Sequence, residues 1–208
     1  MTSVVSTKAK IDSSNYIGPN CIIEDNVEIG KNNKLTANIV ITGNTKIGNN
    51  NTFYPFSTIG TNPQDLKYKG EESYLYIGNN NTFREYVTVN TGTEGGGLET
   101  RIENNCLFMV GSHIAHDCII KSNVILANNA TLAGHVEIFE NAIIGGNSAI
   151  HQHVKIGKFA MIGGMSGVEK NIIPYSLYTG IRSELKGINI IGLKRKGLSK
   201  DTIKKIQD

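Results

Sequence analysis

The residues of this chain best suited to chemistry are its histidines, and their spacing places them together. The five histidines are His113, His116, His135, His151 and His153. They flank or follow Ile114, Leu132 and Ile150, which are eighteen positions apart. If eighteen residues form one turn of a repeating coil, all the histidines lie on one side of three successive turns.

Outward-facing imidazoles that lie close together can perform two kinds of chemistry. Imidazole has a pKa near neutrality, so a histidine can act as a general base that takes a proton from an alcohol. Alternatively, three neutral imidazoles can bind zinc and leave the fourth position to water. His116 is followed by Asp117, and a carboxylate beside a general base can hold its tautomer and stabilise the imidazolium.

A row of histidines on one flat face does not make a pocket. Because ligand sites are concave, we expect the face of a second subunit to complete the site. Repeated heterologous faces that close into a ring favour three chains, so the sequence predicts a homotrimer.

The element that positions the histidines is a repeat of six residues. Isoleucine or another apolar residue recurs at every sixth position from Ile11 to Ile59 and again from Ile102 to Val168. This period corresponds to a short strand plus a turn, which is typical of a parallel β-helix of hexapeptide repeats. In the second run, the residue two positions earlier is small or β-branched, from Cys106 to Ser166. Positions two apart share a face of a strand, so both residues point into the coil. The fold class is therefore all-β.

The turns between these strands carry residues that tolerate a positive φ. Asparagine follows the apolar position by three residues at Asn20, Asn26, Asn32, Asn38, Asn44 and Asn50. Asparagine is enriched among the non-glycine residues that adopt the left-handed conformation, so we expect a sharp corner at each. Three strands and three corners then close one triangular coil of eighteen residues.

The repeat is interrupted twice, and both interruptions are expected to be loops. Asp65 and Glu71 stand where apolar residues belong, which predicts a loop over residues 61–76. The spacing slips again before Ile102, which predicts a second loop over residues 90–100, and the run Gly95–Gly97 indicates flexibility there. Loops of this length within a regular repeat are usually functional.

The sequence divides into a β-helix over residues 1–180 and a C-terminal segment over residues 181–208. The six-residue pattern fades through Pro174, and a helix is predicted from Ser199 to Gln207, with Ser199 as its cap and Ile203 and Ile206 as its apolar stripe. We expect this helix to be the start of a truncated helical domain.

Composition limits the partners and the compartment. The net charge is +3, but lysine and arginine gather near the C-terminus, where they form either a solvated tail or a docking surface for an acidic partner. No aromatic or recognition-helix pattern indicates nucleic acid. The three cysteines, Cys21, Cys106 and Cys118, occupy inward positions and are expected to fill the core. No leader or membrane span is evident, so a cytoplasmic protein is expected.

Five stretches of the sequence form specific motifs, namely QDLKY at 64–68, HIAHDC at 113–118, LANNATLAGH at 126–135, AIHQ at 149–152 and GLKR at 192–195. Together these motifs resemble one family, the UDP-N-acetylglucosamine O-acyltransferases of lipid A biosynthesis. The resemblance implies a left-handed β-helix, an exception to the usual right-handed crossover, assembled as a homotrimer with active sites between subunits. It also implies transfer of a 3-hydroxyacyl chain from acyl carrier protein to the 3-hydroxyl of UDP-N-acetylglucosamine, with no cofactor and no metal.

The same resemblance implies roles for individual residues. His116 would be the general base, Asp117 would orient it, and the Gly134 N–H would stabilise the oxyanion. The residues implied in holding the glucosamine and the acyl hydroxyl are Gln64, Asp65, Lys67, His113, His135 and Gln152. Those implied for the nucleotide are His151, Asn189 and Arg195, and those implied in measuring acyl length are Met161 and Gly164. Ile191 and Lys196 depart from the family pattern at the nucleotide-sugar end.

Other functions remain possible from the residues alone. A zinc-dependent β-helical carbonic anhydrase also places histidines between subunits, although the spacing of His113 and His116 fits it poorly. An acyltransferase acting on a 3-amino sugar has the same requirements as one acting on a 3-hydroxyl. A related N-acyltransferase would carry an added N-terminal domain, and an inert scaffold would not need clustered histidines.

Overall fold

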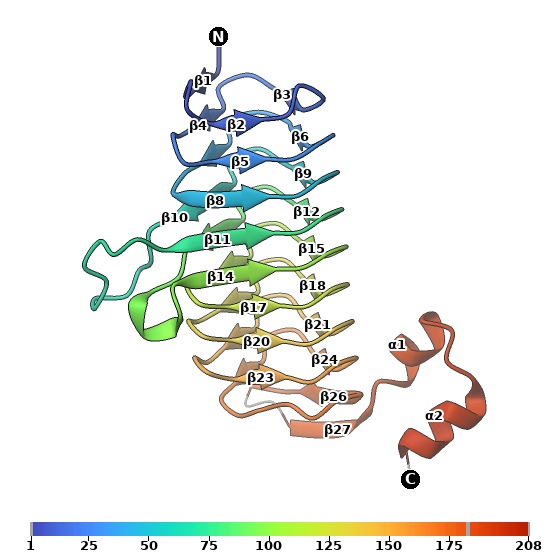
Figure 1. Ribbon diagram of the computed structural model, residues 1–208. Coiled ribbons are helices and arrows are strands. Elements are labelled where there is room, and N and C mark those ends of the chain that lie inside the picture. Colours follow the sequence, from blue (N-terminus) through green and yellow to red (C-terminus); the bar gives the residue numbers. More distant parts are fainter. Residues whose placement is uncertain (1, 182–183, 208) are drawn as a thin grey trace.

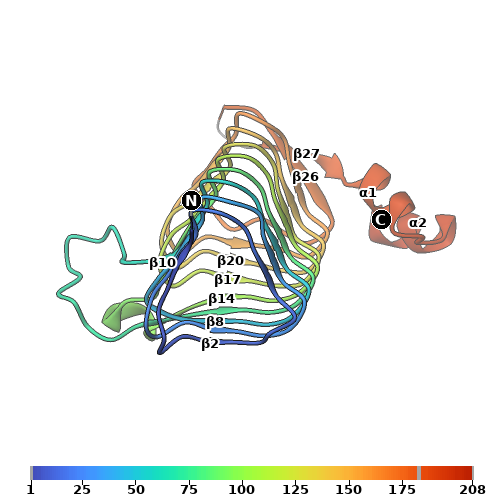
Figure 2. The same cartoon turned by 90° about the horizontal axis from the view of Figure 1, so that it is seen from above.

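The computed structural model describes residues 2–181 and 184–207, and most of them wind into a triangular prism (Figures 1 and 2). Each turn of the chain contributes one strand to each of three sheets, here called faces A, B and C. Neighbouring strands within a face are parallel, except for the last pair of the chain, and the coil is left-handed. The predicted fold class is confirmed.

The strands are two to five residues long and are stacked in register. Face A contains β1 (Val4–Val5), β4 (Ile22–Ile23), β7 (Val40–Ile41), β10 (Thr58–Thr61), β13 (Thr88–Asn90), β16 (His113–Ile114), β19 (Thr131–Leu132), β22 (Ala149–Ile150) and β25 (Gly167–Val168). Face B contains β2 (Lys10–Ile11), β5 (Glu28–Ile29), β8 (Asn44–Ile47), β11 (Tyr74–Ile77), β14 (Glu99–Ile102), β17 (Ile119–Ile120), β20 (Glu137–Ile138) and β23 (Lys155–Ile156). Face C contains β3 (Tyr16–Ile17), β6 (Lys34–Leu35), β9 (Thr52–Phe53), β12 (Thr82–Phe83), β15 (Leu107–Phe108), β18 (Ile125–Leu126), β21 (Ile143–Ile144), β24 (Met161–Ile162), β26 (Ser176–Thr179) and β27 (Glu184–Ile188).

The corners between faces are named AB, BC and CA after the faces that they join. Asn20 and Asn38 at corner CA and Asn32 and Asn50 at corner BC have the predicted positive φ, between 51° and 59°. The prediction is wrong for Asn26 and Asn44, which lack a positive φ. These two lie on the early turns of corner AB, where the chain turns differently; Asn44 is already part of β8.

The interior of the prism is filled by the apolar residues of the repeat. The side chains of Phe53, Phe83 and Phe108 stack in consecutive coils, with ring centroids 4.7 and 4.8 Å apart. The three cysteines are free and buried, as predicted for core residues. Because this core is continuous along the axis, the prism gives every corner a rigid support.

A buried column of asparagines at corner BC ties the coils together. The Oδ1 atoms of Asn33, Asn51 and Asn81 each accept the backbone N–H of the residue in the next coil, at 2.8 Å. The Nδ2 atom of each of these asparagines donates to a backbone carbonyl in the same next coil. Since buried amides are costly unless hydrogen-bonded, this column fixes the register of the stack.

Two loops leave the prism at corner AB, one between β10 and β11 and the other between β13 and β14 (Figure 1). The first is shorter than the predicted 61–76, because Tyr74 begins β11, and the second ends before Glu99, which begins β14. The Gly95–Gly97 run is not a flexible tether. It belongs to a short 3₁₀ helix, η1 (Glu94–Gly96), that packs against Asp117.

The end of the chain differs from the repeat. Strands β26 and β27 pair antiparallel, and they are followed by α1 (Ile190–Arg195) and α2 (Lys200–Gln207). The Oγ of Ser199 accepts the N–H of Thr202 at 3.1 Å, so Ser199 caps α2 as predicted. The hairpin and α1 were not predicted. Within the described ranges, neither helix has the length and apolar character needed to cross a membrane.

Candidate active site

The histidines lie at corner AB, where three successive coils of the chain turn. Each turn contains a residue with a left-handed backbone conformation. Asp117, His135 and His153 have φ values of 60°, 63° and 64°. Their coils stack through β16, β19 and β22, with Ile114 paired to Leu132 and Leu132 to Ile150. The predicted clustering of the five histidines on one side of the prism is therefore present in the structure.

His116 and Asp117 form a close pair. The Nδ1 atom of His116 lies 2.7 Å from Oδ2 of Asp117, and the side chains are 12% and 0% exposed. With Nδ1 held by the carboxylate, Nε2 of His116 has no hydrogen-bond partner among the described residues. This nitrogen is the atom available to a substrate.

The second loop covers Asp117 and holds its carboxylate. The backbone N–H of Thr93 donates to Oδ1 at 2.8 Å, and the Thr93 hydroxyl donates to Oδ2 at 2.6 Å. A side chain at Gly96 would collide with the same carboxylate. Thr93 and Gly96 were missed in the sequence, where the signals available were the conformational freedom of the glycines and the change of spacing before Ile102.

Gly134 lies directly against the His116 imidazole. It stands one coil beyond His116, and any β-carbon at this position would collide with the His116 ring. Within the described chain, the N–H of Gly134 donates to no other residue. Gly134 therefore serves two needs, since it leaves space for the base and presents an unpaired backbone donor beside it.

His135 and His153 extend the cluster along the corner. The His116 and His135 rings meet edge to face with centroids 5.0 Å apart, and the His135 and His153 rings stack at 4.3 Å. Burial lowers the pKa of His135, an effect that the Asp117 carboxylate opposes and that His153 and His116 reinforce. The lowered pKa favours the neutral form of His135, in which its 3.8 Å contact with Asp117 is not an ion pair.

The remaining histidines differ in their surroundings. Nδ1 of His113 lies 2.7 Å from the Thr88 hydroxyl, and burial, with a smaller effect from His116, lowers the pKa of His113. His151 and Gln152 are exposed, and Nδ1 of His151 lies 3.2 Å from the Gln152 carbonyl. Each therefore has ring or amide atoms free for a ligand.

The first loop brings Asp65 towards the cluster. The Asp65 carboxylate lies close enough to His135 to raise the pKa of that histidine slightly, against the effect of burial. Its Oδ1 also accepts the backbone N–H of Lys67 at 2.9 Å, which fixes a turn at the tip of the loop. Gln64 and Lys67 are exposed on the same loop.

The other predicted site residues lie elsewhere on the chain. Met161 belongs to β24 on face C, and Gly164 follows it on corner CA. Asn189 caps α1 by accepting the N–H of Gly192, and its Nδ2 donates to the carbonyl of Phe159 on corner BC. Figure 2 shows α1, which includes Arg195, across the prism from the two loops of corner AB. A single chain does not bring these residues to the histidines.

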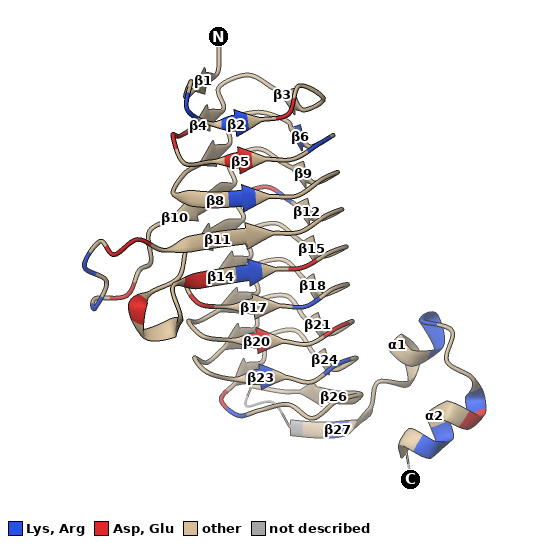
Figure 3. Cartoon of the chain, viewed as in Figure 1, with Lys and Arg blue, Asp and Glu red and all other residues tan. Residues whose placement is uncertain are grey.

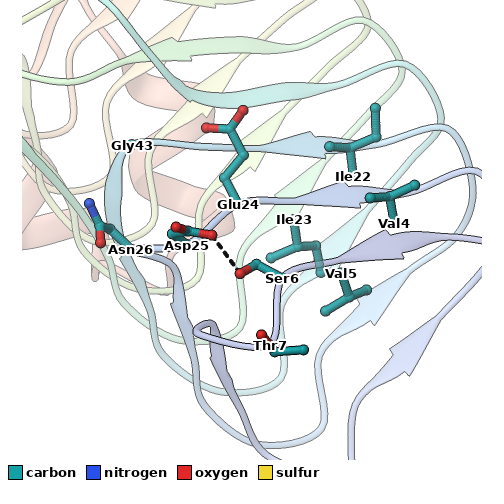
Figure 4. Close-up of a pocket in the computed structure, with 10 residues that line it drawn as sticks. All are labelled: Val4, Val5, Ser6, Thr7, Ile22, Ile23, Glu24, Asp25, Asn26 and Gly43. Atoms are coloured by element: carbon teal, nitrogen blue, oxygen red, sulfur yellow. Dashed lines mark hydrogen bonds between the residues drawn. The ribbon is translucent and has the colours of Figure 1, made fainter.

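Four pockets on the described chain lie outside the histidine cluster, although one of them includes Val168, whose carbonyl accepts the N–H of His151. The pocket in Figure 4 lies on the first coils at the N-terminal end, where the Ser6 hydroxyl donates to Asp25 Oδ1 at 2.6 Å. No histidine lines any of these four pockets. None of the four is therefore a site built around the histidine cluster.

The cluster could be considered as a metal centre. Among the described residues, His116, Asp117 and His135 have ligand atoms within 4.8 Å of one another. However, both oxygens of Asp117 already accept hydrogen bonds from Thr93, and one also contacts His116. A metal ion would have to displace these bonds, so the geometry favours a base oriented by a carboxylate.

Comparisons with known proteins agree with this geometry. A family model described as bacterial transferase hexapeptide matches residues 99–134, and one described as UDP-N-acetylglucosamine O-acyltransferase, domain 2, matches residues 171–208. An acyl-[acyl-carrier-protein]–UDP-N-acetylglucosamine O-acyltransferase from Thermodesulfovibrio yellowstonii is 51% identical over 97% of this chain and 78% of its own length.

Solved structures show the same likeness. The LpxA structure from Acinetobacter baumannii has 46% identity and a TM-score of 0.96 over 99% of this chain and 80% of that chain. The UDP-N-acetylglucosamine acyltransferase from Francisella novicida has 41% identity and a TM-score of 0.97, over 99% of this chain and 75% of that one.

A left-handed hexapeptide coil with a carboxylate-oriented histidine at its corner defines the class of hexapeptide-repeat acyltransferases. Within that class, the chain belongs to the family of acyl-[acyl-carrier-protein]–UDP-N-acetylglucosamine O-acyltransferases.

Proposed function

We propose that this protein transfers an (R)-3-hydroxyacyl chain from acyl carrier protein to the 3-hydroxyl of UDP-N-acetylglucosamine, the first step of lipid A biosynthesis. The observation that carries the proposal is the His116–Asp117 pair, whose imidazole lies directly against Gly134, a residue with an unpaired N–H. A base and an oxyanion donor at one point are the two groups that acyl transfer to an alcohol requires.

In the proposed reaction His116 moves one proton. Its Nε2 takes the proton of the sugar 3-hydroxyl while the oxygen attacks the thioester carbonyl carbon, so a C–O bond forms. Asp117 stabilises the resulting imidazolium through the 2.7 Å contact with Nδ1. When the tetrahedral intermediate collapses, the C–S bond breaks and the imidazolium returns the proton to the departing thiol.

The other site residues bind and orient the two substrates. The Gly134 N–H donates to the carbonyl oxygen as its negative charge develops. Asp65 and Lys67 of the first loop, with Gln64, His113, His135 and Gln152, hold the glucosamine and the acyl hydroxyl. His151, Asn189 and Arg195 bind the nucleotide, because a guanidinium offers a fork of donors to the diphosphate. The Asn189 side chain, which caps α1, acts by placing that helix.

We further propose a homotrimer, supported by the charges on the three faces. The strands of face A carry no lysine, arginine, aspartate or glutamate in the described coils, and Lys34 is the one such residue among the outward residues of β3 to β26 on face C. Face B instead carries charged residues along its length, including the pairs Lys10–Glu28 and Lys155–Glu137 (Figure 3). Uncharged faces are those expected at an interface.

The same contact completes the site. If face A of one copy meets face C of the next, the histidine corner of the first lies near Met161 and α1 of its neighbour. Heterologous contacts of this kind close into a ring. Analytical ultracentrifugation should give three times the 22.6 kDa mass of the chain, and a monomeric, active protein would exclude the shared site.

The function is tested by an acylation assay that offers two acceptors. Purified protein is given 3-hydroxyacyl-acyl carrier protein with either UDP-N-acetylglucosamine or its 3-amino analogue, and products are followed by mass spectrometry. The proposal expects an ester on the 3-hydroxyl. An amide formed many times faster would identify a 3-amino sugar as the acceptor, and no transfer to either would reject the proposal.

Lys67→Ala is expected to weaken substrate binding without weakening the fold. Lys67 is exposed, and its described hydrogen bond is made by the backbone N–H, which alanine keeps. Surface changes alter stability by roughly 0.5 kcal/mol or less, equivalent to about 1–2 °C in melting temperature for a chain of this size. The KM for substrate should rise, while the melting temperature should stay within this range. A large loss of stability with unchanged kinetics would make the loop structural.

The basic C-terminal segment is proposed to dock the acidic acyl carrier protein. Its residues, here called the basic cluster, are Lys194, Arg195, Lys196, Lys200, Lys204 and Lys205, and all are exposed. Salt shortens the Debye length from about 8 Å near physiological strength to about 3 Å at one molar. The KM for acyl carrier protein should therefore rise steeply with salt and rise further on reversing the charge of Lys200 and Lys204.

The control for this docking test is a pantetheine-linked acyl donor, which has no protein surface. Its KM should change little with salt or with the two charge reversals, provided Arg195 is left intact. Equal salt sensitivity for both donors would show that the basic cluster is a solvated surface and not a docking site.

Because the donor is a cytoplasmic carrier, we also assign the protein to the cytoplasm, in agreement with its three free buried thiols.

A further inference from the structure

Thr93 makes contacts that local structure does not require. It occupies the N-cap position of η1, with an extended backbone (φ −127°, ψ 162°), yet its side chain makes no capping hydrogen bond. Threonine at this position ordinarily satisfies a free backbone N–H of the first helical turn. Here the hydroxyl is directed instead to Oδ2 of Asp117, at 2.6 Å.

The hydrogen bonds from Thr93 fix both oxygens of the carboxylate. Its backbone N–H takes Oδ1 and its hydroxyl takes Oδ2, the same oxygen that contacts His116. Rotation of the carboxylate about its Cβ–Cγ bond would break both. A carboxylate with a side chain 0% exposed also needs such donors, because an ionised group without water is costly unless it is hydrogen-bonded.

The loop that carries Thr93 is itself braced against the first loop. The Ser73 hydroxyl donates to the Thr91 hydroxyl at 2.8 Å in the interior, and the N–H of Glu94 donates to Glu71 Oε1 at 3.2 Å. The first loop carries Asp65 and Lys67, which the proposed function assigns to the sugar. The two loops thus form one connected unit between the sugar site and the base.

We propose that Thr93 is a positioning residue for the acyl transfer, which holds the Asp117 carboxylate ionised and aimed at His116. The proposal rests on the proposed function, since it assigns a role in the same reaction. The side-chain hydrogen bond that Thr93 makes goes to Asp117, so its proposed effect on His116 is exerted through that carboxylate.

Removing the hydroxyl has a predictable effect on proton binding by the pair. A hydrogen-bond donor to a carboxylate stabilises its ionised form, so removing the Thr93 hydroxyl should favour protonation at the pair. The other titratable groups that face the pair, His113 and His135, together with Asp65 near His135, are unchanged by the substitution.

The test compares Thr93→Val with Thr93→Ser. Valine keeps the β-branched shape and the backbone N–H but removes the hydroxyl, and serine retains the donor. Thr93→Val should lower kcat about tenfold to a hundredfold, the equivalent of one hydrogen bond to a charged group. KM for the sugar should stay within about twofold because Thr93 does not contact it, and the acid limb of the pH profile should move to higher pH. Thr93→Ser should keep most of the wild-type kcat, and its acid limb should lie close to that of the wild type.

Thr91→Val is the matched control, because it removes a hydroxyl two residues away whose partner is Ser73 instead of Asp117. It should leave the pH profile in place. Wild-type kcat and pH profile in Thr93→Val would overturn the proposal. Equal losses in Thr93→Val and Thr93→Ser, with an unmoved pH profile, would also overturn it and make the loop a packing element.

A measurement without substrate separates this proposal from the proposed function. Titration of the His116 imidazole by NMR in the folded protein should show a higher pKa in Thr93→Val than in wild type and Thr93→Ser. If wild-type protein transfers no acyl group but the pKa moves as expected, the function is wrong and the positioning by Thr93 stands. If transfer is normal and the pKa does not move, the positioning is wrong.

Discussion

His116→Ala should reduce the rate of acyl transfer by about a hundredfold to ten-thousandfold, the usual contribution of a general base. The side chain lies at corner AB outside the apolar interior, and its described hydrogen bond is to Asp117 alone. Its loss removes the proton acceptor without removing core packing. Turnover is measured with saturating donor and acceptor, and the melting temperature and sedimentation are recorded alongside.

His151→Ala provides the comparison, because it removes an exposed imidazole from the same corner. It is assigned to the nucleotide, so KM for the sugar nucleotide should rise while kcat is largely kept. A His116→Ala protein that retains more than half of the wild-type turnover would show that another group is the base.

Two inactive variants are expected to restore activity when they share one trimer. In a site made from two chains, His116 comes from one copy and Arg195 from its neighbour. When His116→Ala and Arg195→Ala chains mix at random in a ring, about a quarter of the sites combine an intact His116 with an intact Arg195. Co-expressed chains, purified together through one tag that both chains carry, should therefore regain about a quarter of the wild-type activity.

The control places both substitutions in one chain and co-expresses it with wild type. A site shared between two chains is active only when both chains are wild type, so about a quarter of the sites remain active. If each site lay within one chain, about half of the sites would remain active. Two results together would rule out the shared site. The mixed variants would be no more active than each variant alone, and the control would keep about half of its sites active.

The β-helix could be predicted because each six-residue step carries its own signal. Most inward positions are apolar or small, and the loops coincide with the polar residues Asp65 and Glu71 at apolar positions and with the slip in spacing before Ile102. The corners were predicted less well. Asn20 and Asn50 turn with a positive φ, but Asn26 and Asn44 do not, since asparagine permits that conformation without requiring it.

The placement of the histidines followed from the coil length, but the support of Asp117 could not be predicted in this way. Thr93 lies twenty-four positions before Asp117 in a segment that has left the repeat, so no period relates the two. The contact depends on how the loop folds back over the corner. The hairpin of β26 and β27 and helix α1 escaped prediction for a similar reason, because they are short elements outside the repeat.

The two loops also show where this architecture accommodates a change in chain length. Leu132 pairs with Ile150, eighteen residues on, but Ile59 pairs with Val89, thirty on, and Ile77 with Ile102, twenty-five on. The extra residues leave at corner AB, and the partners on either side resume the same register. Insertions and deletions at this one edge therefore leave the interior unaltered. Grafting loops of different length there should change which acceptor is bound while the coil beneath keeps its stability, so this edge is the natural place for the family to diversify.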